Sequence, residues 1–226
     1  MLFLVTDTSG KQGSVALARA KEPDVNQVEV IEVAPLAGGA FSAQLVPQIA
    51  ALLTRQRLCK TDVDAFIVVC GPGSFTGLRV GLAAIKALAE ILKKPIVAVS
   101  LLEAMAVACR TQGKVVAVLD AGRGDVYFGS YEIAGDAVRV LQEQLLSKAE
   151  FACQARESMV VTPDLTLAMT AREANLPVLV VDPPGAEMIT RFGVRRLRAG
   201  ETVSPEQLEA NYMRRSDAEM FVKSSS

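Results

Sequence analysis

The chain has 226 residues, half of them hydrophobic, and its 24 basic and 25 acidic residues give a net charge of −1. Acidic and basic residues are mixed along the whole sequence, which argues against tight, independent binding of nucleic acid. The sequence contains no histidine. This absence excludes a Ser-His-Asp triad, a Cys-His pair and a histidine-ligated metal from the chain's own chemistry.

The cysteines and the apolar segments indicate the compartment. Cys59, Cys70, Cys109 and Cys153 lie far apart without a C-x-x-C pair, a pattern typical of buried, reduced thiols rather than of a zinc site or a disulfide framework. No apolar run reaches the roughly 18 residues that span a bilayer, and Asp7 interrupts the N-terminal run too early for a secretion signal. We expect a soluble, cytoplasmic chain with no metal and no membrane partner.

Hydrophobic periodicity divides the first half into strands and helices. Ser42 is the expected N-cap of the first helix, Pro47 bends its early turns, and the second helix must end before Pro95. The predicted order is strand 2–7, strand 14–20, strand 27–34, helix 42–53, strand 64–70, helix 75–92, strand 95–100 and helix 101–110.

The second half repeats this order. The predicted elements are strand 114–120, strand 125–132, a segment 136–146 that begins as a strand, helix 147–156, strand 158–163, helix 164–175, strand 177–182 and helix 185–200. The segments LVTDTSGKQGSVALA and AVLDAGRGDVYFGSY each place an apolar strand before an aspartate, a run of small residues and a second alternating strand. Asp7 and Asp120 therefore occupy corresponding positions.

A repeated βββαβα unit is the plan of the α/β superfamily that contains actin, the sugar kinases and Hsp70. We therefore predict a duplicated actin-like fold with two lobes, residues 1–112 and 113–226, the second ending in a disordered tail at 222–226. Members of that superfamily hold a nucleotide between their lobes and contact its phosphates with the first turn. The shared plan predicts the fold and not the chemistry.

The turn DTSG at 7–10 has two interpretations. In a nucleotide site, Asp7 would lie near a metal-bound phosphate, with Ser9 and Gly10 close to its oxygens and Asp120 as the counterpart in the second half. In the other interpretation the same residues form an ordinary hairpin turn. The two residues that follow depart from the kinase pattern, so we predict a vestigial nucleotide site.

The segment GPGSFTGLR at 71–79 is not a P-loop, because Leu78 and Arg79 stand where a Walker A sequence has Lys and Ser or Thr. The helix in this segment carries Gly77 and Gly81 four residues apart. Glycine inside a helix costs about 1 kcal/mol relative to alanine, so both glycines need a packing or functional reason. Either this side of the helix packs closely on the chain's own sheet, or it holds a helix of another subunit.

The likeness to a known family rests on FIVVCGPGSFTGLRVGLAAIKALA followed by KKPIVAVSLLEAMA, and on LVTDTSGKQGSVAL, FSAQLVPQIAALL, VVAVLDAGRGDVYFGSYE and ANYMRRSDAE. These segments resemble the TsaB (YeaZ) family. The resemblance implies a two-lobed actin-like fold and a role in making threonylcarbamoyladenosine in tRNA. In that pathway TsaB is a non-catalytic relative of the transferase TsaD and its required dimerization partner. TsaD carries the metal-binding histidines that this chain lacks.

The resemblance also implies partners and site residues. The partners are TsaD and the ATPase TsaE, with tRNA reached through the complex, ATP or ADP at the interface with TsaD, and a homodimer when the chain is alone. It implies no catalytic residue and no cofactor of the chain's own. The TsaD-binding surface is placed on the two helices that begin near Ser42 and Thr76, and we expect contributions from Leu45, Ile49, Gly77, Leu78, Arg79, Gly81, Leu82 and Ile85.

Three further features keep alternatives open. Phe41-Ser42 stands where family members commonly have His-Ser, which removes a polar contact at the expected interface. Arg195, Arg196 and Arg198 form a basic stretch that either touches the tRNA backbone or, as is usual for a charged helix face, is solvated. An ATP-dependent kinase that uses the two matching aspartates is the alternative function, and a peptidase ranks last because histidine is absent.

Overall fold

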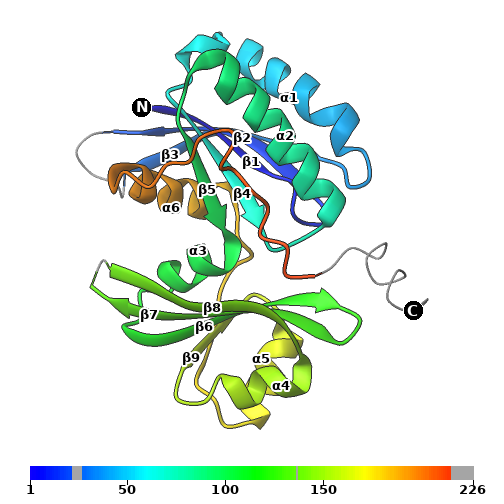
Figure 1. The fold of residues 1–226 in the computed structure, drawn as a ribbon, viewed down its shortest axis with the longest axis vertical. Coiled ribbons are helices and arrows are strands. Elements are labelled where there is room, and N and C mark those ends of the chain that lie inside the picture. Colours follow the sequence, from blue (N-terminus) through cyan, green and yellow to red (C-terminus); the bar gives the residue numbers. More distant parts are fainter. Residues whose placement is uncertain (22–26, 136, 215–226) are drawn as a thin grey trace. The chain divides into compact units, whose positions relative to one another are not determined.

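The computed structural model describes residues 1–21, 27–135 and 137–214, which form two compact units (Figure 1). Unit 1 comprises Met1–Leu101 and Pro184–Asn211. Unit 2 comprises Leu102–Pro183 and, from Tyr212, the last described residues. The predicted tail at 222–226 lies outside the described residues.

The sheet of unit 1 has the strand order β3-β2-β1-β4-β5. Its strands are β1 (Leu2–Asp7), β2 (Gly13–Ala20), β3 (Val28–Leu36), β4 (Ala65–Gly71) and β5 (Ile96–Ser100). The first three strands form an antiparallel meander, and β4 and β5 extend the sheet parallel to β1. β1 and β4 are buried on both faces of the sheet, which explains why their sequences are continuous apolar runs.

Helices cover both faces of this sheet. α1 (Phe41–Arg55) and α2 (Phe75–Leu92) contact each other on one face, and α6 (Ala186–Arg198) lies on the other (Figure 1). Because neighbouring strand residues point to opposite faces, Leu4 and Phe66 join the core under α1 and α2, whereas Ile67 points to α6. The approach there is close, since a Cβ on Gly193 would lie 2.7 Å from the Ile67 side chain.

The first two helices begin in different ways. α1 begins at Phe41 after Ala40, which makes no side-chain capping bond, so the predicted Ser42 cap is corrected. The helix continues through Pro47 to Arg55. Ser74 caps α2 by accepting a hydrogen bond from the Gly77 amide at 3.2 Å, and α2 begins and ends where the sequence predicts.

Unit 2 repeats the arrangement with the strand order β10-β9-β6-β7-β8. Its strands are β6 (Gly113–Gly122), β7 (Asp125–Ala134), β8 (Ala137–Ser147), β9 (Met159–Thr162) and β10 (Val178–Val180). α4 (Lys148–Gln154) and α5 (Leu165–Glu173) enclose a core with β6, β7 and β9 around Phe128 and Phe151. Ser147 and Glu150 form a capping box at α4, and Asp164 caps α5.

The two sheets therefore have the same order when their strands are numbered from the start of each half. Each half runs strand, strand, strand, helix, strand, helix, strand. The predicted α/β class and the duplicated actin-like plan are confirmed. Among the helices of the described ranges, none is long and apolar enough to cross a membrane.

The units do not divide at the predicted boundary between residues 112 and 113. Most of α3 (Leu101–Ala108) groups with unit 2, and residues 184–211 group with unit 1. The physical reason is the packing of α6, which contacts β1, β2, β3, β4 and β5 although it follows the last strand of unit 2 in sequence. Helical periodicity shows that α6 has a buried side but not which sheet covers it.

Candidate protein-binding surface

Gly77 and Gly81 face the chain's own first turn. A Cβ on Gly77 would collide with the carbonyl oxygen of Thr8 and lie 3.1 Å from the ring of Phe41. A Cβ on Gly81 would collide with Oγ1 of Thr8. The inner side of α2 therefore touches the end of β1 at backbone distance. Of the two explanations for these glycines, close packing within the chain is the one that the structure supports.

The same packing buries most of the predicted interface residues. Seven of the eight are buried inside unit 1, and their contribution to a partner interface stays a prediction. The seven are Leu45, Ile49, Gly77, Leu78, Gly81, Leu82 and Ile85. The eighth, Arg79, is exposed.

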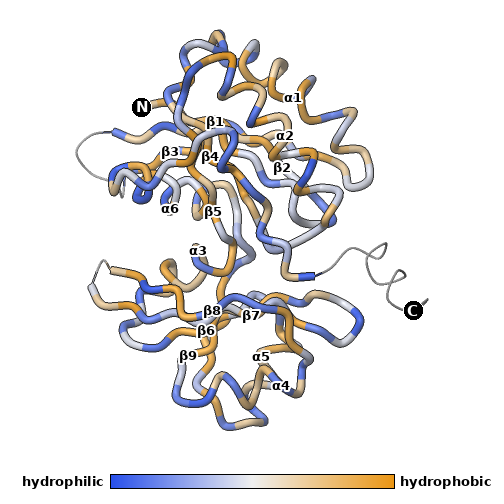
Figure 2. Tube along the Cα trace, viewed as in Figure 1, coloured by the Kyte–Doolittle hydropathy of each residue, from blue (hydrophilic) through white to orange (hydrophobic). Residues whose placement is uncertain are grey.

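The opposite side of the same two helices is exposed and carries apolar residues beside polar ones such as Ser42, Thr76 and Glu90. Val46 on α1 is 57% exposed and Ile91 on α2 is 71% exposed. Figure 2 shows hydrophobic residues along much of both helices. We call this side the α1/α2 surface, and it consists of Ala43, Val46, Pro47 and Ala50 of α1 with Ala83, Ala87 and Ile91 of α2. Exposed apolar patches of this kind mark sites of interaction.

The sequence analysis placed the expected contacts of α1 and α2 on the side of these helices that is buried in the structure. One signal pointed to the exposed side: α1 has no charged residue before Arg55. The exposed side of α1 combines apolar residues with the uncharged Ser42 and Thr54, whereas the exposed side of a surface helix usually carries charged residues. Since α1 contacts the sheet on one side only, its second apolar side requires another explanation.

Arg79 lies at the edge of the α1/α2 surface. It follows Phe75 by four residues and precedes Ala83 by four, so the three side chains follow one line along the helix. The guanidinium carbon lies 3.8 Å from the centroid of the Phe75 ring. This stacking orients the only cation in the first half of α2.

Asp7 is held by its own turn. The amide and the hydroxyl of Ser9 both donate to Oδ1 of Asp7, at 2.9 and 2.6 Å. Burial raises the pKa of Asp7 above its ordinary value, and the two hydrogen bonds from Ser9 act in the opposite direction. Ser9 is buried and Gly10 is exposed. These contacts fit the hairpin interpretation, while the vestigial nucleotide site and the kinase alternative stay predictions.

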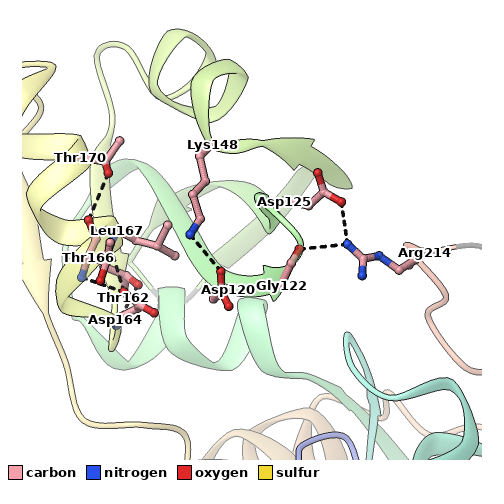
Figure 3. Close-up of polar contacts among 10 residues, drawn as sticks. All are labelled: Asp120, Gly122, Asp125, Lys148, Thr162, Asp164, Thr166, Leu167, Thr170 and Arg214. Carbon is pink, nitrogen blue, oxygen red and sulfur yellow. Dashed lines mark hydrogen bonds and ion pairs between the residues drawn. The ribbon is translucent and has the colours of Figure 1, made fainter.

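Asp120, the counterpart of Asp7, contacts a lysine (Figure 3). Its Oδ1 lies 3.3 Å from Nζ of Lys148, at the start of α4. Where β6 ends and β7 begins, Arg214 donates to the carbonyl oxygen of Gly122 at 3.2 Å and to Oδ2 of Asp125 at 2.6 Å. The sequence analysis assigned a role to neither cation, because both pair with residues that are distant in the sequence.

Two other predictions concern charged and sulfur-containing residues. Nε of Arg196 lies 2.9 Å from Oε2 of Glu201, so part of the basic stretch on α6 is engaged within the chain. Contact of this stretch with tRNA stays a prediction. The expectation of buried thiols is corrected: Cys59 and Cys153 are exposed and the other two cysteines are partly exposed, all four as free thiols.

Comparisons with known proteins relate this arrangement to a family. The family model described as "TsaD: tRNA N6-adenosine threonylcarbamoyltransferase" matches residues 33–175. The tRNA threonylcarbamoyladenosine biosynthesis protein TsaB of Escherichia coli is 28% identical over 229 residues, which cover 95% of each chain. The solved structure of YeaZ from Pseudomonas aeruginosa has a TM-score of 0.68 at 25% identity and covers 93% of this chain and 100% of that one. The chain belongs to the TsaB (YeaZ) family.

Other relatives of this TsaB-family chain are longer. An uncharacterized protein of Mycobacterium leprae is 34% identical over 181 residues, which are 79% of this chain and 46% of that protein. The chain thus spans about half the length of the first curated relatives that it matches. The segment matched by the TsaD family model includes all of α1 and α2. The α1/α2 surface therefore lies in the part of this TsaB-family chain that is related to the transferases.

Proposed function

We propose that this chain is a non-catalytic subunit in the formation of threonylcarbamoyladenosine on tRNA, and that it binds a TsaD-type transferase through the α1/α2 surface. The observation that carries the proposal is the exposed apolar side of two adjacent helices. Two helices that pack side by side on a sheet present a flat ridge, which other helices can pack against. Alanine at positions 43, 50, 83 and 87 allows such helices to approach closely.

The relationship of this chain to the TsaD family favours a TsaD-type transferase as the protein that binds this surface. The family model for the transferase matches this chain across α1 and α2, so a TsaD-type chain is expected to carry two corresponding helices. Related chains can pair through corresponding surfaces about an approximate twofold axis, as identical chains do in symmetric dimers. When the transferase is absent, a second copy of this chain would cover the same surface.

The absence of histidine supports a role outside the chemical step. Histidine is the usual general base near neutral pH and a common metal ligand, and the sequence has none. The transfer of the threonylcarbamoyl group is therefore assigned to the partner. The proposal includes TsaE as a further member of the complex, ATP or ADP at the interface with the transferase, and tRNA bound through the complex.

Binding to the purified transferase of the same organism tests the proposal. Isothermal titration calorimetry and light scattering should detect a complex with the wild-type chain, and Val46→Asp should weaken it because a carboxylate would be buried among apolar groups. Met169→Asp is the matched control, since Met169 is 59% exposed on α5 of unit 2 and Val46 is 57% exposed. Equal weakening by both variants, or no complex with the wild type, would contradict the proposal.

Modification of tRNA gives a second test. A reconstituted reaction with transferase, threonylcarbamoyl donor and tRNA should depend on the addition of this chain. The chain without the transferase should form no product. Product formed by this chain alone would overturn its assignment as a non-catalytic subunit.

A further inference from the structure

Pro47 changes the hydrogen bonding of α1 on its exposed side. α1 runs from Phe41 through Pro47 to Arg55 without a break. In an α-helix each backbone N–H group donates to the carbonyl oxygen four residues earlier, and proline has no N–H group. The carbonyl oxygen of Ala43 therefore lacks the helical donor that any other residue at position 47 would supply.

This carbonyl oxygen lies within the α1/α2 surface. Ala43 and Pro47 are both exposed, and their spacing of four residues places them on the same side of α1. Val46, which is 57% exposed, is their neighbour on that side. Carbonyl groups on the solvent side of a helix tilt outwards, where water reaches them. A partner that covers the α1/α2 surface therefore removes water from the Ala43 oxygen.

Loss of that water has an energetic consequence. A buried acceptor without a hydrogen bond weakens a complex by more than an ordinary hydrogen bond strengthens it. A lysine or arginine donor would itself lose its hydration among the surrounding apolar groups. A hydroxyl or a side-chain amide donates at a smaller cost, and serine and threonine hydroxyls satisfy carbonyl groups freed by proline in membrane helices. A neutral side-chain donor suits this position best.

We propose that the transferase presents a neutral hydrogen-bond donor, the side chain of Ser, Thr, Asn or Gln, to the carbonyl oxygen of Ala43 in the complex. The inference rests on the proposed function, since it concerns the partner of the same surface. Pro47 is thereby a specificity-determining residue, because it leaves one main-chain acceptor open in a part of α1 that has no charged residue. A related chain without a donor at this point binds more weakly, because the oxygen is then buried unpaired.

The test is a double-mutant cycle between the two proteins, with the Kd measured by calorimetry. Single Ser, Thr, Asn and Gln residues on the surface of the purified transferase are exchanged for alanine. One of these transferase variants should bind the wild-type chain about tenfold more weakly than the unchanged transferase does. The same variant should lose at most about twofold in affinity for Pro47→Ala, whose amide supplies the missing helical bond to Ala43.

Val46→Ala is the control in this chain, since it removes apolar area from the same surface and leaves the backbone hydrogen bonds of α1 unchanged. The transferase variant should lose as much affinity for Val46→Ala as for the wild type. Pro47→Ala should unfold at a higher temperature than the wild type, because its helix gains a hydrogen bond. If the wild type binds the transferase and no transferase variant distinguishes it from Pro47→Ala, the inference is overturned and the proposed function stands. If the wild type does not bind, the proposed function and the inference both fail.

Discussion

Thr8 fills the space beside Gly81, because its Oγ1 atom lies where a Cβ on Gly81 would have to be. Thr8 is only 2% exposed, and the next residue of the turn accepts a hydrogen bond from the Ser74 amide at 2.6 Å. The turn after β1 and the start of α2 are therefore packed as one structure. The inner side of the GPGSFTG segment packs within the chain's own fold, and the outer side of α2 is exposed.

Gly81→Ala is expected to lower the free energy of unfolding by about 1–3 kcal/mol, the usual cost of overpacking. This loss should appear although alanine is about 1 kcal/mol better than glycine in a helix. Thr8→Ala removes the obstructing side chain and should restore much of the stability of Gly81→Ala. Denaturant unfolding of both single variants and the double variant measures this coupling.

Gly77→Ala is the control for that cycle. Its new Cβ would collide with the carbonyl oxygen of Thr8, which no substitution of the Thr8 side chain removes. Thr8→Ala should therefore leave Gly77→Ala as unstable as before. Equal rescue at both glycines would show that the Thr8 side chain is not the obstacle.

Thr6→Val is expected to raise the free energy of unfolding by about 1 kcal/mol. Thr6 is 1% exposed, and its hydroxyl makes no hydrogen bond among the described residues, so valine of similar shape removes an unpaired polar group. Thr162→Val should have the opposite effect. Thr162 is equally buried, but its hydroxyl accepts a hydrogen bond from the Asp164 amide at 3.1 Å. Urea unfolding of both variants decides the sign.

Because the pKa of Asp7 is raised in the folded chain, we expect Asp7→Asn to increase the free energy of unfolding by an amount that depends on pH. The folded chain binds the Asp7 proton more tightly than the unfolded chain, so this contribution to stability is fully present below 3.8, the ordinary value, and is lost as the pH rises through the folded pKa. Asparagine keeps an oxygen that accepts from Ser9. The variant should therefore be more stable than the wild type at pH 7, and the difference should shrink as the pH approaches 3.8.

Glu150→Gln is expected to change the free energy of unfolding in the opposite direction when its stability is measured against pH in the same way. Hydrogen bonds from Ser147 hold the pKa of Glu150 below its ordinary value of 4.5. The ionised Glu150 side chain contributes to the stability of the folded chain above pH 4.5, and this contribution is lost as the pH falls through the pKa of Glu150 in the folded chain. The variant should be less stable than the wild type at pH 7, and the difference should disappear in acid. A common sign for both variants would contradict these assignments.

Arg214→Gln is expected to raise the pKa of Tyr127. Burial already raises the pKa of this phenol, and the positive charge of Arg214 lowers it by favouring the tyrosinate. Removal of that charge leaves the effect of burial unopposed. Ultraviolet titration in a background with Tyr131→Phe and Tyr212→Phe reports on Tyr127 alone. Lys148→Gln should leave the titration unchanged, because that lysine pairs with Asp120.

Most of the fold follows from short-range patterns in the sequence. β1 and β4 were predictable because strands buried on both faces must be apolar throughout. α2 was predictable because a glycine-rich turn precedes it and Pro95 limits its end, whereas its cap at Ser74 was not foreseen. β8 was predicted only in part. It lies at the edge of its sheet, and only one of its residues is buried, so its sequence carries little alternation.

The site was less predictable, because the information needed is not local. In α2, apolar residues occupy both the inner and the outer side, so periodicity does not show which side meets the sheet. The contact between Thr8 and Gly81 joins residues far apart in the chain. The same holds for Arg214 and Asp125, whose pairing depends on the path of the chain after α6.

The return of α6 to the first sheet affects the order in which the protein is completed during synthesis. All strands of unit 2 belong to residues 102–183, which leave the ribosome as one continuous stretch. Unit 1 needs residues 184–211 to cover the second face of its sheet. The nascent chain therefore closes its later half first. The half that is translated first keeps Ile67 and the rest of that apolar face uncovered until residues 184–211 have been made.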